Sequence, residues 1–283
     1  MKKILSVLMA VVMVFSVVML FAACSKDEPN TNADPSKVDV SNEDVSASAE
    51  MKTVKDGVLT MATNANFPPY EFMEGDNYAG IDVEIAGKIA EKLGLELEIV
   101  NIEFGAIVAG VQTGKFDMGM AGMTVTDERK ESVDFSDSYA TGIQAIIVPE
   151  GSAIKSVDDI KADGTMTIGV QQDTTGDIYA SDTVENGGFG EENVKRYPNG
   201  ADAVQDLKAG RLDCVIIDNE PAKAFVANNE GLVVLDTEYV IEDYAICFAK
   251  ENPGLRDAVN NALAELKADG TVQAIIDKFI KAE

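Results

Sequence analysis

The hydrophobic pattern predicts alternating strands and helices from Gly57 onward. An apolar run at 58–62 indicates a strand, and the apolar positions between Asp82 and Gly94 recur at helical spacing. We expect Asp82 to cap this helix and Gly94 to end it. The same reading predicts a strand, a helix and a buried strand at residues 95–99, 106–113 and 116–121. This order is typical of an α/β protein with helices on both faces of a parallel sheet.

An internal repeat suggests two equivalent lobes. Residues 111–118 (VQTGKFDM) and 207–214 (LKAGRLDC) share one pattern: a helix end, a glycine stop and the start of a buried strand. Five residues after the motif aspartate stand Gly122 in the first copy and Asp218 in the second. Because ligands of open α/β sheets bind beyond the carboxyl ends of strands, we expect these two positions to face one cleft.

The first residues have the composition of a secretory leader. Two lysines precede an apolar run at 4–23, which ends in Ala-Ala followed by Cys24. We interpret residues 1–23 as a lipoprotein signal peptide and Cys24 as the acylated residue. The alternative is a membrane-spanning anchor, because about 20 apolar residues can cross a bilayer. Residues 24–56 are acidic and nearly free of large apolar side chains, so we expect a disordered tether.

Composition excludes several classes of function. The chain has no histidine, which removes Ser-His-Asp and Cys-His catalysis and His-ligated metals. With 23 basic and 49 acidic residues the net charge is −26, which argues against nucleic-acid binding. Of the three cysteines, Cys214 and Cys247 lie in apolar runs and are expected to be buried thiols. We therefore expect no catalytic residues, no metal and no cofactor.

Chemistry suited to a zwitterion follows the two repeat strands. Ala121 and Gly122 are small enough to let a ligand approach the backbone, and Arg129 offers a planar fork for a carboxylate. Asp218 offers a carboxylate for a cation, although it could instead cap a following helix. An amino acid carries both of the charges that these residues would bind.

Five segments together resemble one known family, the solute-binding proteins of polar amino-acid ABC transporters. The segments are ATNANFPPYEF at 62–72, GIDVEIAGKIAEKLG at 80–94, AGMTVTDERKESVDFSDSY at 121–139, GVQQDTTGDIYA at 169–180 and IIDNEPA at 216–222. The resemblance covers nearly everything from Gly57 onward. It implies the two-lobe α/β fold of the type 2 periplasmic-binding proteins.

That fold implies two lobes, each a mainly parallel sheet flanked by helices, joined by two hinge crossovers. We place lobe 1 at 57–142 and 243–283, and lobe 2 at 143–242. The crossings are expected near 139–146 and 242–246.

The resemblance also assigns ligand contacts. It places Arg129 on the α-carboxylate and Asp218 on the α-ammonium. The other matching positions are Asn64 and Gln171 at the ligand side chain, Phe67 and Phe104 on either side of it, and Thr124, Thr174 and Thr175 at the carboxylate. Many relatives have an acid where this chain has Asn64, and a glycine where it has Asp173. The choice between a polar neutral and a basic ligand therefore stays open.

We expect a monomeric lipoprotein on the outer face of the cytoplasmic membrane that captures a free amino acid and delivers it to the permease of an ABC importer. Two alternatives are an enzyme on the same fold, such as a cyclohexadienyl dehydratase, and a ligand-sensing module. The absence of histidine and the Arg129/Asp218 pair favour binding without turnover.

Overall fold

The computed structural model describes residues 50–236 and 240–281. The chain divides into two units, Met1–Ser46 and Ala47–Glu283, and the described residues belong to the second. The expected signal peptide, Cys24 and most of the expected tether lie outside the described residues. Within the described ranges, no helix is long and apolar enough to cross a membrane.

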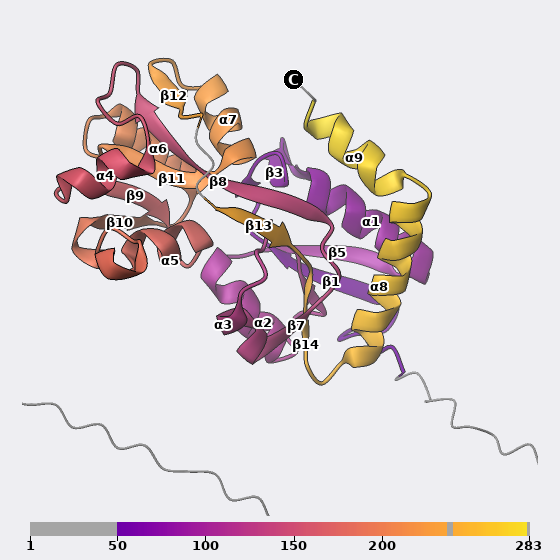
Figure 1. Cartoon of the computed structure of the whole chain (residues 1–283). Coiled ribbons are helices and arrows are strands. Elements are labelled where there is room, and N and C mark those ends of the chain that lie inside the picture. Colours follow the sequence, from indigo (N-terminus) through magenta and orange to yellow (C-terminus); the bar gives the residue numbers. More distant parts are fainter. Residues whose placement is uncertain (1–49, 237–239, 282–283) are drawn as a thin grey trace, which may run out of the picture. The chain divides into compact units, whose positions relative to one another are not determined.

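The first lobe is built on a five-stranded sheet (Figure 1). Its strand order is β5 (Glu96–Asn101), β1 (Val58–Thr63), β6 (Met118–Gly119), β14 (Cys247–Ala249) and β7 (Val133–Phe135). β5, β1 and β6 run parallel, whereas β14 is antiparallel to both of its neighbours. Of the buried strand expected at 116–121, only the two residues of β6 are in extended pairing.

The second lobe repeats this plan. Its strand order is β10 (Val194–Tyr197), β9 (Ile168–Gln171), β11 (Cys214–Asp218), β8 (Ala140–Pro149) and β12 (Leu232–Val234), with β13 (Ile241–Tyr244) pairing to β8. β10, β9 and β11 are parallel, and β8 is antiparallel to β11 and β12. The strands that begin in the repeated motif, β6 and β11, occupy equivalent positions in the two sheets, each third in the strand order, as the repeat predicted.

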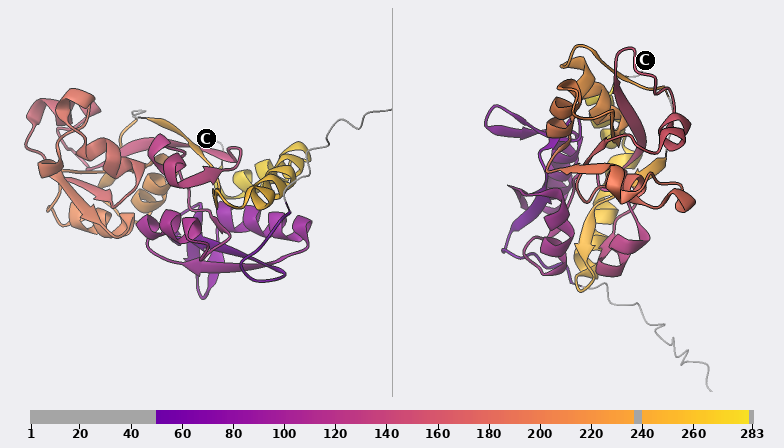
Figure 2. Two further views of the ribbon diagram at one scale, coloured as in Figure 1. Left: turned by 90° about the horizontal axis from the view of Figure 1, so that it is seen from below. Right: turned by 90° about the vertical axis from the view of Figure 1, so that its left-hand side faces the viewer.

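Two neighbouring strands join the lobes. The first residues of β8 pair antiparallel with β13, while its later residues pair with β11 and β12. Figure 2 shows this connection from two further sides. The predicted two-lobe α/β fold with two crossovers is confirmed. In each sheet one strand adjoining a crossover, β14 or β8, runs opposite to all the others, so both sheets are mainly parallel in strand direction, as predicted.

Helices cover both faces of each sheet. In lobe 1 they are α1 (Ile81–Leu93), α2 (Ile107–Gln112), α3 (Asp127–Ser132), α8 (Pro253–Ala268) and α9 (Thr271–Phe279). In lobe 2 they are α4 (Val157–Asp163), α5 (Thr175–Ser181), α6 (Gly200–Lys208) and α7 (Asn219–Ala227). Short 3-10 turns lie at Phe104–Ala106, Val184–Asn186 and Glu191–Asn193, and a small antiparallel sheet comprises β2 (Asn66–Phe67), β3 (Glu71–Glu74) and β4 (Asn77–Ala79).

The central strands β1 and β11 are buried on both faces. Leu59 and Met61 of β1 join the cluster that contains the apolar face of α1, whereas Ala62 joins the cluster of α2. In β11, Val215 and Ile217 face one cluster and Ile216 the other. This explains the nearly continuous apolar runs of the sequence, since a strand covered on both faces loses its polar alternation.

The first helix begins differently from the prediction. Its N-cap is Gly80, not Asp82, and Gly80 has a φ of 123°. A Cβ at Gly80 would lie 2.2 Å from the carbonyl oxygen of Tyr70, so only glycine fits there. Gly94 ends the helix in the left-handed conformation with a φ of 68°, as predicted. Asp82 is therefore free for another role.

The folded part begins earlier than the expected tether boundary at residue 56. The backbone N–H of Val54 donates to Asp117 Oδ1 over 2.7 Å. The amide of Asn252 donates to the carbonyl of Lys52 over 2.8 Å. Backbone groups hold these residues in place, and side-chain composition carries no signal for such bonds.

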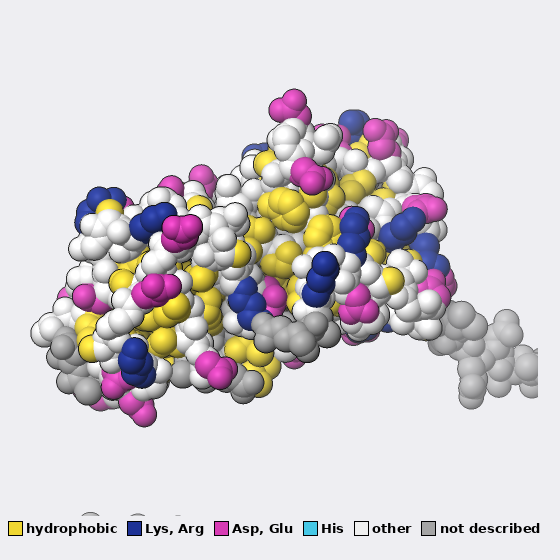
Figure 3. Space-filling model, turned by 90° about the horizontal axis from the view of Figure 1, so that it is seen from above, with side chains coloured by type: hydrophobic (Ala, Val, Ile, Leu, Met, Phe, Trp, Pro, Cys, Tyr) yellow, Lys and Arg dark blue, Asp and Glu magenta, His cyan; other side chains and the backbone are white. Residues whose placement is uncertain are grey.

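Acidic side chains are not gathered into one patch on the face shown in Figure 3. There they are interspersed with Lys and Arg side chains. The net charge of −26 therefore says little about the charge of a ligand in a screened pocket.

Candidate functional site

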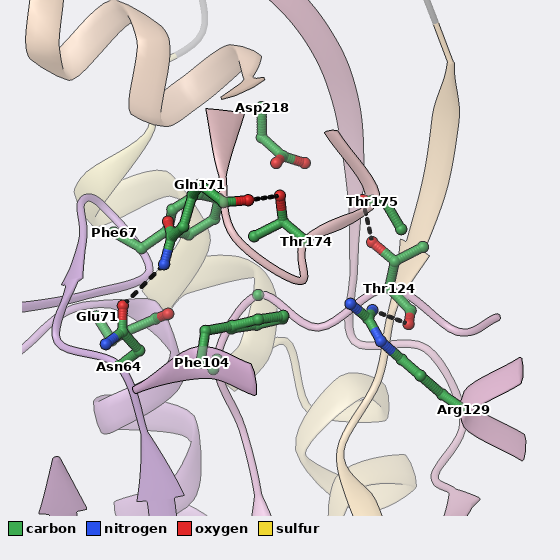
Figure 4. A pocket seen from close by; sticks show the side chains of 12 residues that line it. Asn64, Phe67, Glu71, Phe104, Thr124, Arg129, Gln171, Thr174, Thr175 and Asp218 are labelled. Carbon is green, nitrogen blue, oxygen red and sulfur yellow. Dashed lines mark hydrogen bonds between the residues drawn. The ribbon is translucent and has the colours of Figure 1, made fainter. Parts of the chain in front are cut away.

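A pocket lies between the lobes, lined by side chains from both (Figure 4). Its lining residues are Asn64, Phe67, Glu71, Phe104, Ala121, Gly122, Thr124, Arg129, Gln171, Thr174, Thr175 and Asp218. The structure thus brings together all eleven residues that the sequence singled out for ligand binding, and adds Glu71. The pocket sits past the carboxyl ends of β1, β6, β9 and β11, the position expected for an α/β ligand site.

Arg129 reaches the pocket from α3 on lobe 1. One guanidinium nitrogen donates to the carbonyl of Thr124 over 2.7 Å, and the other donates across the cleft to the carbonyl of Asp173 over 3.1 Å. Its charge lies 5.2 Å from the centre of the Phe104 ring. Burial lowers the pKa of Arg129, and no carboxylate of the described residues forms a salt bridge with it. A ligand carboxylate would supply the missing anion.

Asp218 lies at the end of β11 on lobe 2 and is only 6% exposed. Its side chain makes no capping bond to α7, although it occupies the N-cap position. It accepts instead a hydrogen bond from the hydroxyl of Tyr244 in the crossover strand β13. Burial, followed by the nearby charge of Glu242, raises the pKa of Asp218 to about 7. A bound cation would favour the ionised form.

Direct hydrogen bonds join the lobes around the pocket. Gln171 Nε2 donates to Asn64 Oδ1 over 3.0 Å, while Asn64 donates in turn to the carbonyl of Ile102. The hydroxyls of Thr124 and Thr175 are 3.3 Å apart. Four polar side chains from the two lobes are thus engaged with one another at the pocket wall.

Aromatic rings and a glycine shape the rest of the wall. Phe67 and Phe104 are nearly buried, at 7% and 9% exposed. Gly122 has a φ of 51°, and a Cβ there would lie 2.9 Å from the Phe67 ring. The absence of a side chain at Gly122 lets the aromatic wall and the strand end meet.

Glu71 is the lining residue that sequence reasoning missed. It is fully buried in β3, and neither carboxylate oxygen has a conventional hydrogen-bond donor. Burial, and then the neighbouring Asp82, raise its pKa well above the ordinary value. The residue lies in the segment 62–72, but its burial depends on β3 folding under the pocket, which no local pattern reveals.

Asp82 links Glu71 to the pocket floor. Asp82 Oδ2 accepts the backbone N–H of Gly122 over 2.8 Å and the hydroxyl of Tyr139 over 2.9 Å. Burial raises the pKa of Asp82 to about 6, although both of these donors oppose the rise. Glu71 lies within hydrogen-bonding reach of Asp82, so the two carboxyl groups can share a proton.

Comparison with known proteins identifies the family. Residues 59–282 match the bacterial extracellular solute-binding proteins, family 3. The chain belongs to this family. The arginine-binding extracellular protein ArtP of Bacillus subtilis (strain 168) is 33% identical over 228 residues, covering 80% of this chain and 87% of that protein.

Two solved structures are also similar. An ancestral arginine-binding protein bound to arginine has a TM-score of 0.73 and 38% identity, covering 79% of this chain and 98% of that one. An ancestral arginine-binding protein bound to glutamine has a TM-score of 0.73 and 37% identity, covering 81% of this chain and all of the other. The predicted family and the type 2 fold are confirmed. Because these relatives are named as binding proteins, they support solute binding rather than catalysis.

Proposed function

We propose that this chain captures an amino acid with a cationic side chain and delivers it to an ABC importer. Arg129 binds the α-carboxylate from lobe 1, and Asp218 binds the α-ammonium from lobe 2. The remaining contacts come from Asn64, Phe67, Glu71, Phe104, Ala121, Gly122, Thr124, Gln171, Thr174 and Thr175. Contacts to both lobes favour closure around the hinge strands.

The buried carboxyl group of Glu71 is our reason for proposing a ligand with a cationic side chain, because neither of its oxygens accepts a hydrogen bond from a conventional donor. Of the described lining residues, Arg129 is basic, whereas Asp218 and Glu71 are acidic. A zwitterion neutralises Arg129 and Asp218 and leaves Glu71 without a partner. Without a counter-ion, burial and the neighbouring Asp82 keep Glu71 protonated, and a ligand guanidinium or ammonium would favour its ionised form. The similarity to ArtP and to the ancestral arginine-binding protein bound to arginine supports the same class of ligand.

Arginine and citrulline test this proposal, because citrulline has nearly the same shape and a neutral side chain. Calorimetry on ligand-stripped protein should show arginine binding roughly thirtyfold or more tightly than citrulline. In Glu71→Gln, which keeps the shape but removes the charge, arginine should lose most of that advantage. Citrulline affinity should change by only about threefold or less, because its urea group needs no counter-ion.

Equal affinity of the native protein for arginine and citrulline would contradict the cationic assignment. A wider screen of amino acids by thermal shift separates this result from a failure of the whole proposal. A ligand at 100 times its dissociation constant should add about 2.7 kcal/mol of stability. If no amino acid stabilised the protein, the amino-acid assignment itself would be wrong.

A neutral amide side chain is the second candidate, favoured by the pair Asn64 and Gln171. Gln171 Oε1 is buried without a hydrogen-bond donor, and a ligand amide could supply one. Glu71 in its protonated form could then donate to the amide carbonyl. The similar ancestral protein bound to glutamine supports this alternative. A preference for glutamine over arginine in the screen would establish it.

We also propose that the protein acts as a monomer, held outside the cytoplasmic membrane by lipid on Cys24. Residues 1–23 would be removed as a signal peptide, and residues 24–56 would include the tether. This rests on the run of apolar residues that ends at Cys24. Cys24→Ser should release the protein from membranes or leave it uncleaved. Normal processing and lipid labelling of that variant would disprove the anchor, and light scattering would test the monomer.

A further inference from the structure

Glu242 is a buried acid just behind the pocket wall. It lies in the crossover strand β13 and is 4% exposed. Its Oε2 accepts the hydroxyl of Thr124 over 3.1 Å and the amide of Gln144 over 3.0 Å. The hydroxyl of Tyr179 in α5 is a further hydrogen-bonding partner. Glu242 thus collects donors from both lobes and from the neighbouring crossover strand.

The hydrogen bonds around Glu242 form a chain in which each donor points toward the Glu242 carboxylate. Gln144 Nε2 also donates to Thr175 Oγ1 over 3.4 Å. The next contact joins Thr175 Oγ1 to Thr124 Oγ1 over 3.3 Å. Because Thr124 uses its single O–H to donate a hydrogen bond to Glu242, Thr175 must be the donor in that contact. The carboxylate at the end of the chain therefore sets the direction of both hydroxyls.

This direction decides what Thr124 can offer a ligand. Because the Thr124 O–H already donates to Glu242, the hydroxyl can only accept a hydrogen bond from a ligand in the pocket. A carboxylate needs donors, whereas an ammonium needs acceptors. Thr124 lines the same pocket as Asp218, the residue proposed for the α-ammonium. Its hydroxyl therefore suits the α-ammonium, and not the carboxylate as the family resemblance implied.

We propose that Glu242 is a positioning residue for the α-ammonium of the ligand. It holds the Thr124 hydroxyl as a hydrogen-bond acceptor, and its charge reinforces that of Asp218. This inference rests on the proposed function, because it takes the α-ammonium to bind beside Asp218. It gives the crossover strand β13 a part in recognising the ligand, through Thr124.

The surrounding charges agree with this role. Glu242 is close enough to Asp218 for its charge to contribute to the raised pKa of that carboxyl. The charge of Glu242 also offsets part of the decrease that burial causes in the pKa of Arg129. Two acidic groups converge where one cation would bind, so a ligand ammonium would favour the ionised form of Asp218 beside Glu242.

Glu242→Gln tests the charge with little change of shape, and Glu242→Met removes the acceptor. Each is measured by calorimetry with L-arginine and with δ-guanidinovaleric acid, which lacks only the α-ammonium. Loss of a hydrogen bond to a charged group predicts about tenfold weaker arginine binding in Glu242→Gln, and more in Glu242→Met. The des-amino acid should change by about threefold or less. Equal losses for both ligands, or no loss for arginine, would overturn the proposal.

Thr124→Val gives the matched control, because it removes the hydroxyl through which Glu242 acts. In a Thr124→Val background, Glu242→Gln should reduce arginine affinity much less than it does alone. Additive effects would show that Glu242 does not act through Thr124. If the Glu242 variants failed to fold, Thr124→Val would still have to weaken arginine more than the des-amino acid. If the native protein bound glutamine but not arginine, the same test would use glutamine and its des-amino analogue, glutaramic acid. If the protein bound no amino acid, the proposed function would be refuted, and not the role of Glu242.

Discussion

Asp218 makes ligand binding depend on pH. Burial raises its pKa from 3.8 to about 7, so the ligand-free carboxyl holds a proton through mildly acidic pH. Binding an ammonium there requires the ionised form. Amino-acid affinity should therefore rise as pH increases toward about 7, by up to about tenfold per pH unit for one released proton, and then level off. Calorimetry across this range measures the slope.

Asp218→Asn is the control for this effect. The variant should bind an amino acid roughly thirtyfold or more weakly at neutral pH, because the amide leaves the α-ammonium without its counter-ion. Its affinity should also depend less steeply on pH, with the remainder due to Glu71 and Asp82. A native profile that stays flat below neutrality would contradict the buried, protonated state of Asp218.

The same raised pKa affects folding in the opposite sense. An acid whose pKa is higher in the folded state binds a proton on folding between its two pKa values. For Asp218 these values are 3.8 and about 7, so its contribution to the free energy of unfolding declines as pH rises between them. Ligand-free protein should therefore lose stability over the interval in which its ligand affinity increases.

Single residues of the pocket differed in how far the sequence revealed them. Arg129 and Asp218 could be found because each follows a strand of a repeated motif, and strand ends meet at one edge of a sheet. Glu71 could not be found from its neighbours. Its importance comes from burial beside Asp82, and those two residues are eleven positions apart on different elements.

The start of α1 provides a test at the level of one element. Gly80→Ala would place a Cβ 2.2 Å from the Tyr70 carbonyl in a backbone conformation with a φ of 123°. The free energy of unfolding should fall by about 2–4 kcal/mol, because strain and a backbone clash act together. Urea denaturation measures this change.

Gly87 is a matched control in the same helix. A Cβ there meets no atom within 4 Å, and its φ lies in the ordinary range. Gly87→Ala should raise the free energy of unfolding by about 0.5–1 kcal/mol through better helix propensity. Similar effects of the two substitutions would refute the close approach of Gly80 to Tyr70.

Elements were predictable where their own pattern is complete. The run at 58–62 became β1, and Gly94 ends α1 as its sequence position indicates. The strand expected at 116–121 shrank to β6, because pairing depends on how far its neighbours run alongside. Asp82 has the residue type of a helix cap but accepts bonds from Gly122 and Tyr139 instead.

Closure of the two lobes is the main prediction for the whole molecule. Arg129 bonds to the Asp173 carbonyl across the cleft and is also the proposed carboxylate site. Adding arginine to ligand-stripped protein should reduce the radius of gyration measured by X-ray scattering. Arg129→Ala should weaken binding roughly thirtyfold or more and abolish this compaction at the same arginine concentration.

Phe104→Ala is the comparison for this prediction, since it removes packing and leaves the charges in place. It should weaken binding less than Arg129→Ala and still permit compaction at saturating arginine. Compaction of Arg129→Ala at the concentration that closes the native protein would place the carboxylate site elsewhere.

The sequence by itself determined the class of fold, the repeat and the position of most pocket residues. These properties follow from local patterns: apolar periodicity, glycine stops and motifs that end strands. The tertiary structure alone decided which buried acids meet. Glu71 lies beside Asp82, and Glu242 of a crossover strand accepts a hydrogen bond from the hydroxyl of Thr124. Such contacts join residues distant in sequence, and their energies depend on burial and on the direction of hydrogen bonds, neither of which a linear pattern records.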